Sequence, residues 1–131
     1  MECPQNVKAH ILVVDDSGFA RRILRQFLTG AGHTVDEAKD GIEALERYTA
    51  RKPDVVLLDM VMHGMDGMQV LLKLRELDAK ARVVVATADI QASTRREAEE
   101  AGAIGMISKP FEEERVLRAI EAAASGGVAW S

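Results

Sequence analysis

Short apolar runs alternate with longer amphipathic stretches along nearly the whole chain, in one repeated rhythm. The first run, residues 11–14, is wholly apolar, and apolar side chains then recur with a 3.6-residue period from Ala20 to Ala31. Ser17 suits the N-cap of this helix because its hydroxyl can accept a hydrogen bond from an unpaired amide, and Gly30 and Gly32 suit its end. The same rhythm predicts further strands at 34–38, 54–58, 82–87 and 104–108 and further helices at 41–50, 67–77, 91–101 and 112–124.

The apolar runs predict the fold class. Strands that are apolar on both faces are typical of parallel sheets covered by helices on either side. Five strand–helix units therefore predict an α/β fold: a doubly wound, five-stranded parallel sheet with five helices in three layers and right-handed crossovers. In the second helix, we expect Ile42, Ala44, Leu45 and Tyr48 to face the sheet.

Length and composition narrow the class of protein. The 131 residues fit one domain, which we expect at 7–125, with flexible termini or a truncated linker at 1–6 and 126–131. A formal net charge of −4 argues against non-specific nucleic-acid binding, which needs surplus positive charge. The single cysteine, Cys3, cannot form an internal disulfide, and no apolar run approaches the ~20 residues of a membrane span. These features predict a soluble cytoplasmic domain that binds neither membrane nor nucleic acid.

Acidic and polar residues stand where the predicted strands end. Asp15 and Asp16 follow the first strand and Asp59 the third, while Thr87 ends the fourth and Lys109 follows the fifth. In doubly wound sheets the ligand site lies outside the carboxyl ends of the strands. Two carboxylates ~5 Å apart would repel by roughly 3 kcal/mol at an effective dielectric of about 20, so the cluster needs a counter-charge. Oxygen ligands without His or Cys favour Mg²⁺, with Mn²⁺ or Ca²⁺ as alternatives.

Each of these residues also has a purely structural interpretation. Asp16 suits a helix cap or a turn, Thr87 suits a strand end, and Lys109 alone would be a solvated lysine. Their joint placement at the ends of four strands favours the functional interpretation. The three histidines are expected to be structural or solvated, and the methionines after the third strand are expected to pack in the core; these residues are His10, His33, His63, Met60, Met62, Met65 and Met68. No glycine-rich phosphate loop follows the first strand.

Five stretches, spread in order over nearly the whole chain, resemble a known family. They are residues 11–17 (ILVVDDS), 57–60 (LLDM), 64–67 (GMDG), 87–88 (TA) and 108–111 (SKPF). In this order they resemble the receiver domains of two-component response regulators of the stand-alone chemotaxis type. The resemblance implies the flavodoxin-like strand order 2-1-3-4-5, which is one of the common strand orders of doubly wound parallel sheets.

The resemblance also implies roles for individual residues. Asp59 would be the phosphoacceptor, and Asp15 and Asp16 would hold Mg²⁺ together with Asp59 and the backbone carbonyl of Val61. Thr87 would be the switch hydroxyl. Lys109 would pair with the phosphoryl group, ahead of a cis peptide bond to Pro110. A histidine kinase or histidine phosphotransfer protein would donate the phosphoryl group, and the fourth helix, fifth strand and fifth helix would present a surface to an unknown downstream protein, from a monomer or an activation-dependent dimer.

Several positions depart from the family's usual residues or lie where the family sets the lifetime of the phosphoryl group. Met106 stands where many members carry Tyr or Phe, and a flexible thioether cannot reproduce the rotamer change of an aromatic ring. His63 replaces a common proline. Val61 and Asp89 occupy positions that tune the lifetime of the phosphoryl group, and Ala88 adjoins the switch threonine among the modulating positions.

Phe19 has two possible roles. It lies near Asp16 in the sequence, where it would help to seat the helical phosphodonor or would be half-buried packing.

Three classes of function are considered, and a phosphorylation-controlled switch is the leading one. An enzyme with an aspartyl-phosphate intermediate is a second class, although haloacid-dehalogenase-like enzymes need an Asp at the position of Val61. A receiver that binds partners without phosphorylation is a third, which Met106 keeps open.

Overall fold

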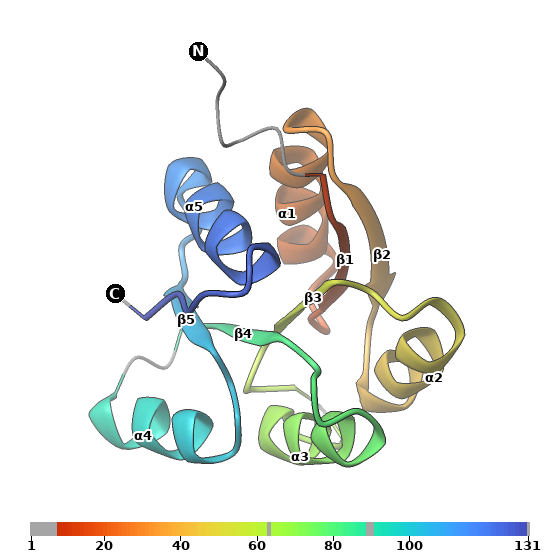
Figure 1. Cartoon of the computed structure of the whole chain (residues 1–131), viewed down its shortest axis with the longest axis vertical. Coiled ribbons are helices and arrows are strands. Elements are labelled where there is room, and N and C mark those ends of the chain that lie inside the picture. Colours follow the sequence, from red (N-terminus) through yellow and green to blue (C-terminus); the bar gives the residue numbers. More distant parts are fainter. Residues whose placement is uncertain (1–7, 63, 89–90, 131) are drawn as a thin grey trace.

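The protein is a three-layer α/β sandwich, seen here in a computed structural model that describes residues 8–62, 64–88 and 91–130 (Figure 1). Within these residues the elements are β1 (His10–Val14), α1 (Gly18–Gly30), β2 (Thr34–Ala38), α2 (Gly41–Arg51), β3 (Val55–Leu58), α3 (Gly67–Leu77), β4 (Val83–Thr87), α4 (Ala92–Glu100), β5 (Gly105–Ser108) and α5 (Glu113–Ala124). All strand pairings are parallel and the order is β2-β1-β3-β4-β5. The predicted fold class and strand order are confirmed.

Helices cover both faces of the sheet, as the apolar strands require. Figure 1 shows α1 and α5 on one face and α2, α3 and α4 on the other. Because successive side chains of a strand point to opposite faces, each central strand contributes to two cores. In β1, Leu12 and Val14 pack with the α2–α4 layer, whereas Ile11 and Val13 pack with α1 and α5.

Side-chain caps fix where the helices next to the site begin. The Ser17 side chain accepts a hydrogen bond from the Ala20 N–H at 3.2 Å, as expected for an N-cap.

In α2 the expectation that Ile42 faces the sheet is wrong, because Ile42 is 63% exposed. Ala44 and Tyr48 face the core four residues apart, and Ile42 lies two residues before Ala44, which places it about 200° away around the helix.

The segment after α5 folds back onto the sheet. The Ala129 N–H donates to the Ile104 carbonyl at 2.8 Å, and the Ala129 carbonyl accepts from the Met106 N–H at 3.2 Å. Residues 127–130 therefore contact the sheet edge, within the range 126–131 for which the sequence suggested a flexible terminus or a truncated linker; residues 1–6 and residue 131 lie outside the described residues. A contact between the end of the chain and an edge strand leaves no periodic pattern. Within the described residues no helix is long and apolar enough to span a bilayer.

His33 is a structural histidine, as expected. It is 6% exposed, and its Nδ1 accepts a hydrogen bond from the Ala9 N–H at 3.0 Å. Burial lowers the pKa of His33 from its ordinary value of 6.5, with help from the nearby Lys8 and against the attraction of Glu121. His10 was also expected to be structural or solvated, and its Nε2 lies 2.6 Å from Asp36 Oδ2. His63 lies outside the described residues.

The buried neutral His33 should make stability depend on pH. As the pH falls below 6.5, His33 binds a proton in the unfolded chain. In the folded chain it binds one only at a lower pH, because its pKa is lowered there. The free energy of unfolding should therefore fall as the pH decreases below 6.5, by at most about 1.4 kcal/mol per pH unit from this group. Urea denaturation between neutral and mildly acidic pH should show a steeper loss for wild type than for His33→Asn, whose amide oxygen can still accept the Ala9 bond. Equal slopes in the two proteins would contradict the assignment.

Candidate functional site

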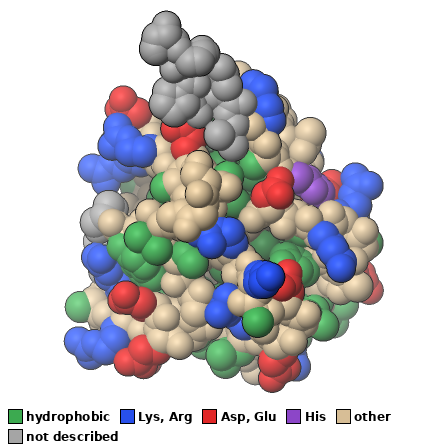
Figure 2. All heavy atoms as spheres, in the orientation of Figure 1, with side chains coloured by type: hydrophobic (Ala, Val, Ile, Leu, Met, Phe, Trp, Pro, Cys, Tyr) green, Lys and Arg blue, Asp and Glu red, His purple; other side chains and the backbone are tan. Residues whose placement is uncertain are grey.

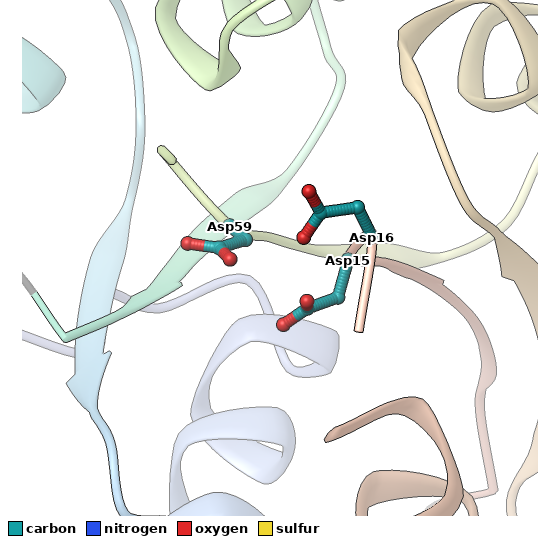
Figure 3. Close-up of side chains that lie close together, drawn as sticks. All are labelled: Asp15, Asp16 and Asp59. Atoms are coloured by element: carbon teal, nitrogen blue, oxygen red, sulfur yellow. The ribbon is translucent and has the colours of Figure 1, made fainter. Parts of the chain in front are cut away.

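Three carboxylates converge at the carboxyl edge of the sheet. Asp15 and Asp16 follow β1 and Asp59 follows β3, its neighbour in the sheet, so the three side chains gather in one place (Figure 3). One oxygen of each carboxylate lies within 4.8 Å of the other two. Asp15 and Asp59 are only 1% and 4% exposed, whereas Asp16 is more accessible. Strand adjacency thus brings together residues that are 44 positions apart in the sequence.

Lys109 provides a positive charge between two of these carboxylates. Its Nζ lies 2.8 Å from Asp15 Oδ2 and 3.1 Å from Asp59 Oδ2. Lys109 follows β5, and its backbone N–H donates to the Thr87 carbonyl at 3.0 Å, which fixes the start of the loop to the end of β4. The peptide bond between Lys109 and Pro110 is cis, as expected.

Burial and charge shift the pKa values in this cluster. Burial raises the pKa of Asp15, and the neighbouring charge of Asp59 adds to the increase, although Lys109 and the Ser17 N–H oppose it. For Lys109, burial acts to lower the pKa, but the bonds to Asp15 and Asp59 outweigh it and the net pKa is raised. Lys109 is therefore an ammonium ion at neutral pH, and the folded state disfavours the charged form of Asp15.

The donor set fits a hard divalent cation. The Asp15 Oδ2 atom is buried and, among the described residues, accepts no hydrogen bond of good geometry, although it faces the Lys109 ammonium. With all three carboxylates ionised, one lysine leaves two net negative charges in the cluster. A cation bound by carboxylate oxygens would balance this charge, and the set contains neither imidazole nor thiolate that would favour a softer metal.

The other predicted positions lie around this cluster. Thr87 is completely buried at the end of β4, Ala88 beyond it is exposed, and Met106 lies half-buried in β5, paired with Val85. Val61 is 66% exposed, and its N–H donates to Asp59 Oδ1 at 3.1 Å. Asp89 and His63 lie outside the described residues.

Two residues with important positions received no role from the sequence. Gly67, the first residue of α3, lies so close to the loop after β3 that a Cβ there would be 2.4 Å from the Asp59 carbonyl oxygen. Arg21 donates from Nη1 to the Asp15 carbonyl at 2.6 Å and pairs with Glu37. The glycine at the start of a predicted helix was a signal for close approach, whereas the reach of Arg21 depends on tertiary structure.

Phe19 lies in the first turn of α1, two positions after the Ser17 cap and close in sequence to Asp16. Its side chain is 71% exposed. This exposure excludes the half-buried packing that was the alternative, and it leaves a large aromatic ring in water in the first turn of the helix that follows Asp16. An exposed aromatic ring next to a polar site is typical of a surface that contacts a partner.

Comparisons with known proteins agree with this geometry. A family model described as the response regulator receiver domain matches residues 11–121. The chain is 40% identical over 110 residues to chemotaxis protein CheY of Halobacterium salinarum, covering 84% of this chain and 92% of that protein. It is 34% identical over 111 residues to sporulation initiation phosphotransferase F of Bacillus subtilis, covering 85% and 90%.

A solved structure gives the same result. A chain of the CheX–CheY–BeF3–Mg complex from Borrelia burgdorferi superposes with a TM-score of 0.81 at 35% identity, covering 83% of this chain and 84% of that one. The protein belongs to the receiver domains of two-component response regulators, a family of phosphoacceptor switches. The resemblance of the sequence to receiver domains is thereby confirmed.

Proposed function

We propose that Asp59 is the phosphoacceptor of this receiver and that a histidine kinase or histidine phosphotransfer protein is the donor. An Asp59 carboxylate oxygen attacks the phosphorus, the bond from phosphorus to the donor imidazole nitrogen breaks, and that nitrogen keeps the electron pair. The product is an acyl phosphate, and water later hydrolyses it to inorganic phosphate and the free carboxylate. The observation that carries the proposal is the ion pair between Lys109 and buried Asp59 beside two further carboxylates.

The chain's own residues make this transfer feasible. Lys109 already lies 3.1 Å from Asp59, so its ammonium is placed to neutralise charge on the incoming phosphoryl oxygens without large rearrangement. The Val61 N–H holds the second oxygen of Asp59 at 3.1 Å, which orients the carboxylate. The acceptor is thus fixed before the donor arrives, which removes part of the entropic cost of transfer.

Asp15, Asp16, Asp59 and the backbone carbonyl of Val61 would hold Mg²⁺. The ion, when bound, offsets the negative charge of the carboxylates and of the phosphoryl oxygens. The all-oxygen donor set supports this assignment, as does the buried Asp15 Oδ2, which accepts no hydrogen bond of good geometry among the described residues. The related Borrelia burgdorferi complex was solved with BeF3 and Mg, which is consistent with it.

Thr87 is the residue that would report the change at Asp59. Its buried hydroxyl lies at the end of β4, and its carbonyl already accepts from the Lys109 backbone. New phosphoryl oxygens would offer an acceptor to this hydroxyl and draw the β4 end inward, with Ala88, Asp89 and Met106 setting how the shift spreads. The readout face is formed by α4, β5 and α5, and it would bind a downstream protein in a chemotaxis-like cytoplasmic pathway.

Exposed Phe19 and Val61 would contact the helical donor protein next to Asp59. The receiver domain would span residues 7–125, as a monomer or as a dimer that forms on activation. It would contact neither nucleic acid nor membrane directly.

Intact-mass spectrometry after incubation with acetyl phosphate tests the phosphoacceptor. We expect one phosphoryl adduct on wild type that requires Mg²⁺ and is absent in Asp59→Asn. Asp54→Asn is the matched control, because it makes the same substitution at the opposite end of β3. There the Asp54 carboxylate accepts a hydrogen bond from the His10 N–H. Beryllofluoride binding would detect the site if the adduct is short-lived. An adduct retained in Asp59→Asn, or failure of wild type in both assays, would refute the assignment.

A further inference from the structure

The segment after α5 is built to return toward the sheet. Gly126 has a φ of +92°, a conformation that favours glycine, and its N–H donates to the Ala123 carbonyl at 3.2 Å. The Gly127 N–H donates to the Ala122 carbonyl at 2.8 Å, and the Arg82 guanidinium bonds both the Ala123 and Gly127 carbonyls. These bonds fix a reversal that directs the following residues toward β5.

The returning segment adds to the outer edge of the sheet. β5 is an edge strand, and the 2.8 Å and 3.2 Å bonds of Ala129 to Ile104 and Met106 make a parallel bridge with Gly105. Gly105 permits this approach: a Cβ there would lie 2.6 Å from the Ala129 Cβ and 2.8 Å from its carbonyl oxygen. An unpaired strand edge is a template for added strands, and here the chain occupies its own edge.

Trp130 extends the contact from β5 to α4. The Arg95 guanidinium carbon lies 5.2 Å from the centre of the indole ring, a cation–π distance, and the ring packs against the core cluster that includes Met106 at its margin. Trp130, Val128, Met106 and Arg95 line one groove together with residues of α5. In Figure 2 hydrophobic side chains flanked by Lys and Arg gather on the side where Figure 1 places β5 and the last described residues.

We propose that residues 127–130 are an intramolecular ligand of the α4–β5–α5 groove. The groove accepts an extended segment that pairs with the β5 edge and places an aromatic ring beside Arg95. A protein partner that uses this face must displace the segment, and it needs the same chemistry: a main chain free to pair and a large aromatic side chain. The contacts that hold the segment involve neither Asp59 nor Lys109, whereas the consequence of its displacement for signalling rests on the proposed function.

Intrinsic fluorescence tests the proposal directly, because Trp130 is the only tryptophan in the sequence. Iodide and acrylamide quenching should be measured on the full chain without Mg²⁺ or phosphodonor. We expect quenching of Trp130 to rise several-fold in Gly105→Ala, whose new methyl group would collide with Ala129, and its emission to shift to longer wavelength. Gly30→Ala is the matched control, since a Cβ at Gly30 meets nothing within 4 Å, and it should behave as wild type.

A second variant guards against misfolding of the first. Ala129→Pro removes the N–H that bonds Ile104 and changes nothing within the five strands, so it should expose Trp130 while circular dichroism stays native. Wild-type Trp130 as quenchable as in Ala129→Pro would overturn the proposal. So would protection that occurs only in a dimer by size-exclusion chromatography, because the occupant would then be a second copy. The acetyl phosphate assay on the same samples reports the proposed function separately, so either idea can fail alone.

Discussion

Gly67→Ala is expected to destabilise the protein by about 3 kcal/mol and to abolish the proposed phosphorylation of Asp59. The added Cβ would lie 2.4 Å from both the Asp59 carbonyl oxygen and the Met60 Cα. These are backbone atoms, so no flexible side chain can move aside. Either α3 or the loop after β3 must shift, and that loop carries Asp59, the proposed phosphoacceptor, and the Val61 N–H that orients its carboxylate.

Two measurements separate the structural from the chemical effect. Urea denaturation gives the loss of stability. The acetyl phosphate mass assay, run without urea at a temperature where the variant is fully folded, gives the loss of adduct. Gly30→Ala again provides the control for a glycine whose Cβ would meet open space. A Gly67→Ala protein within about 0.5 kcal/mol of wild type would show that the close approach is not a constraint.

The sequence could predict the site because of a property of parallel sheets. Side chains that follow different strands meet at one edge, so Asp15, Asp59, Thr87 and Lys109 could be grouped without coordinates. The elements themselves were predictable because buried parallel strands are continuous apolar runs and the helices have a regular apolar period.

What escaped prediction depends on long-range or fine geometry. Ile42 belongs to an apolar pattern but lies outside the buried arc of α2. The bridge between Ala129 and Gly105 joins two short segments of small residues, which carry no periodic signal. The close approach of Gly67 to the β3 loop follows from how α3 docks; a glycine at the start of a helix signals such an approach but does not identify the atoms that it meets.

The cluster of Asp15, Asp59 and Lys109 should also make stability depend on Mg²⁺. Lys109→Met leaves two buried carboxylates without their ion pairs. Breaking a buried pair costs about 3–5 kcal/mol, and the 25% exposure of the Lys109 side chain reduces the expected loss to about 2 kcal/mol without Mg²⁺. Saturating Mg²⁺ should restore much of that loss, because a cation bound only by the folded state stabilises it.

Asp15→Asn should act in the opposite direction in the same experiment. Burial raises the pKa of Asp15, so its charged form is disfavoured in the folded state, and the neutral amide should remove that cost and increase the free energy of unfolding of the metal-free protein. The amide oxygen can still accept the Ser17 N–H, which bonds Asp15 Oδ1 at 2.9 Å. Thermal and urea unfolding with EDTA and with Mg²⁺ should show that Asp15→Asn has lost most of its response to the ion. The double variant Lys109→Met with Asp15→Asn should be more stable than Lys109→Met alone when Mg²⁺ is removed. If Asp15→Asn instead weakens the metal-free protein as much as Lys109→Met does, Asp15 contributes to the fold through its ion pair and charge repulsion does not govern this cluster.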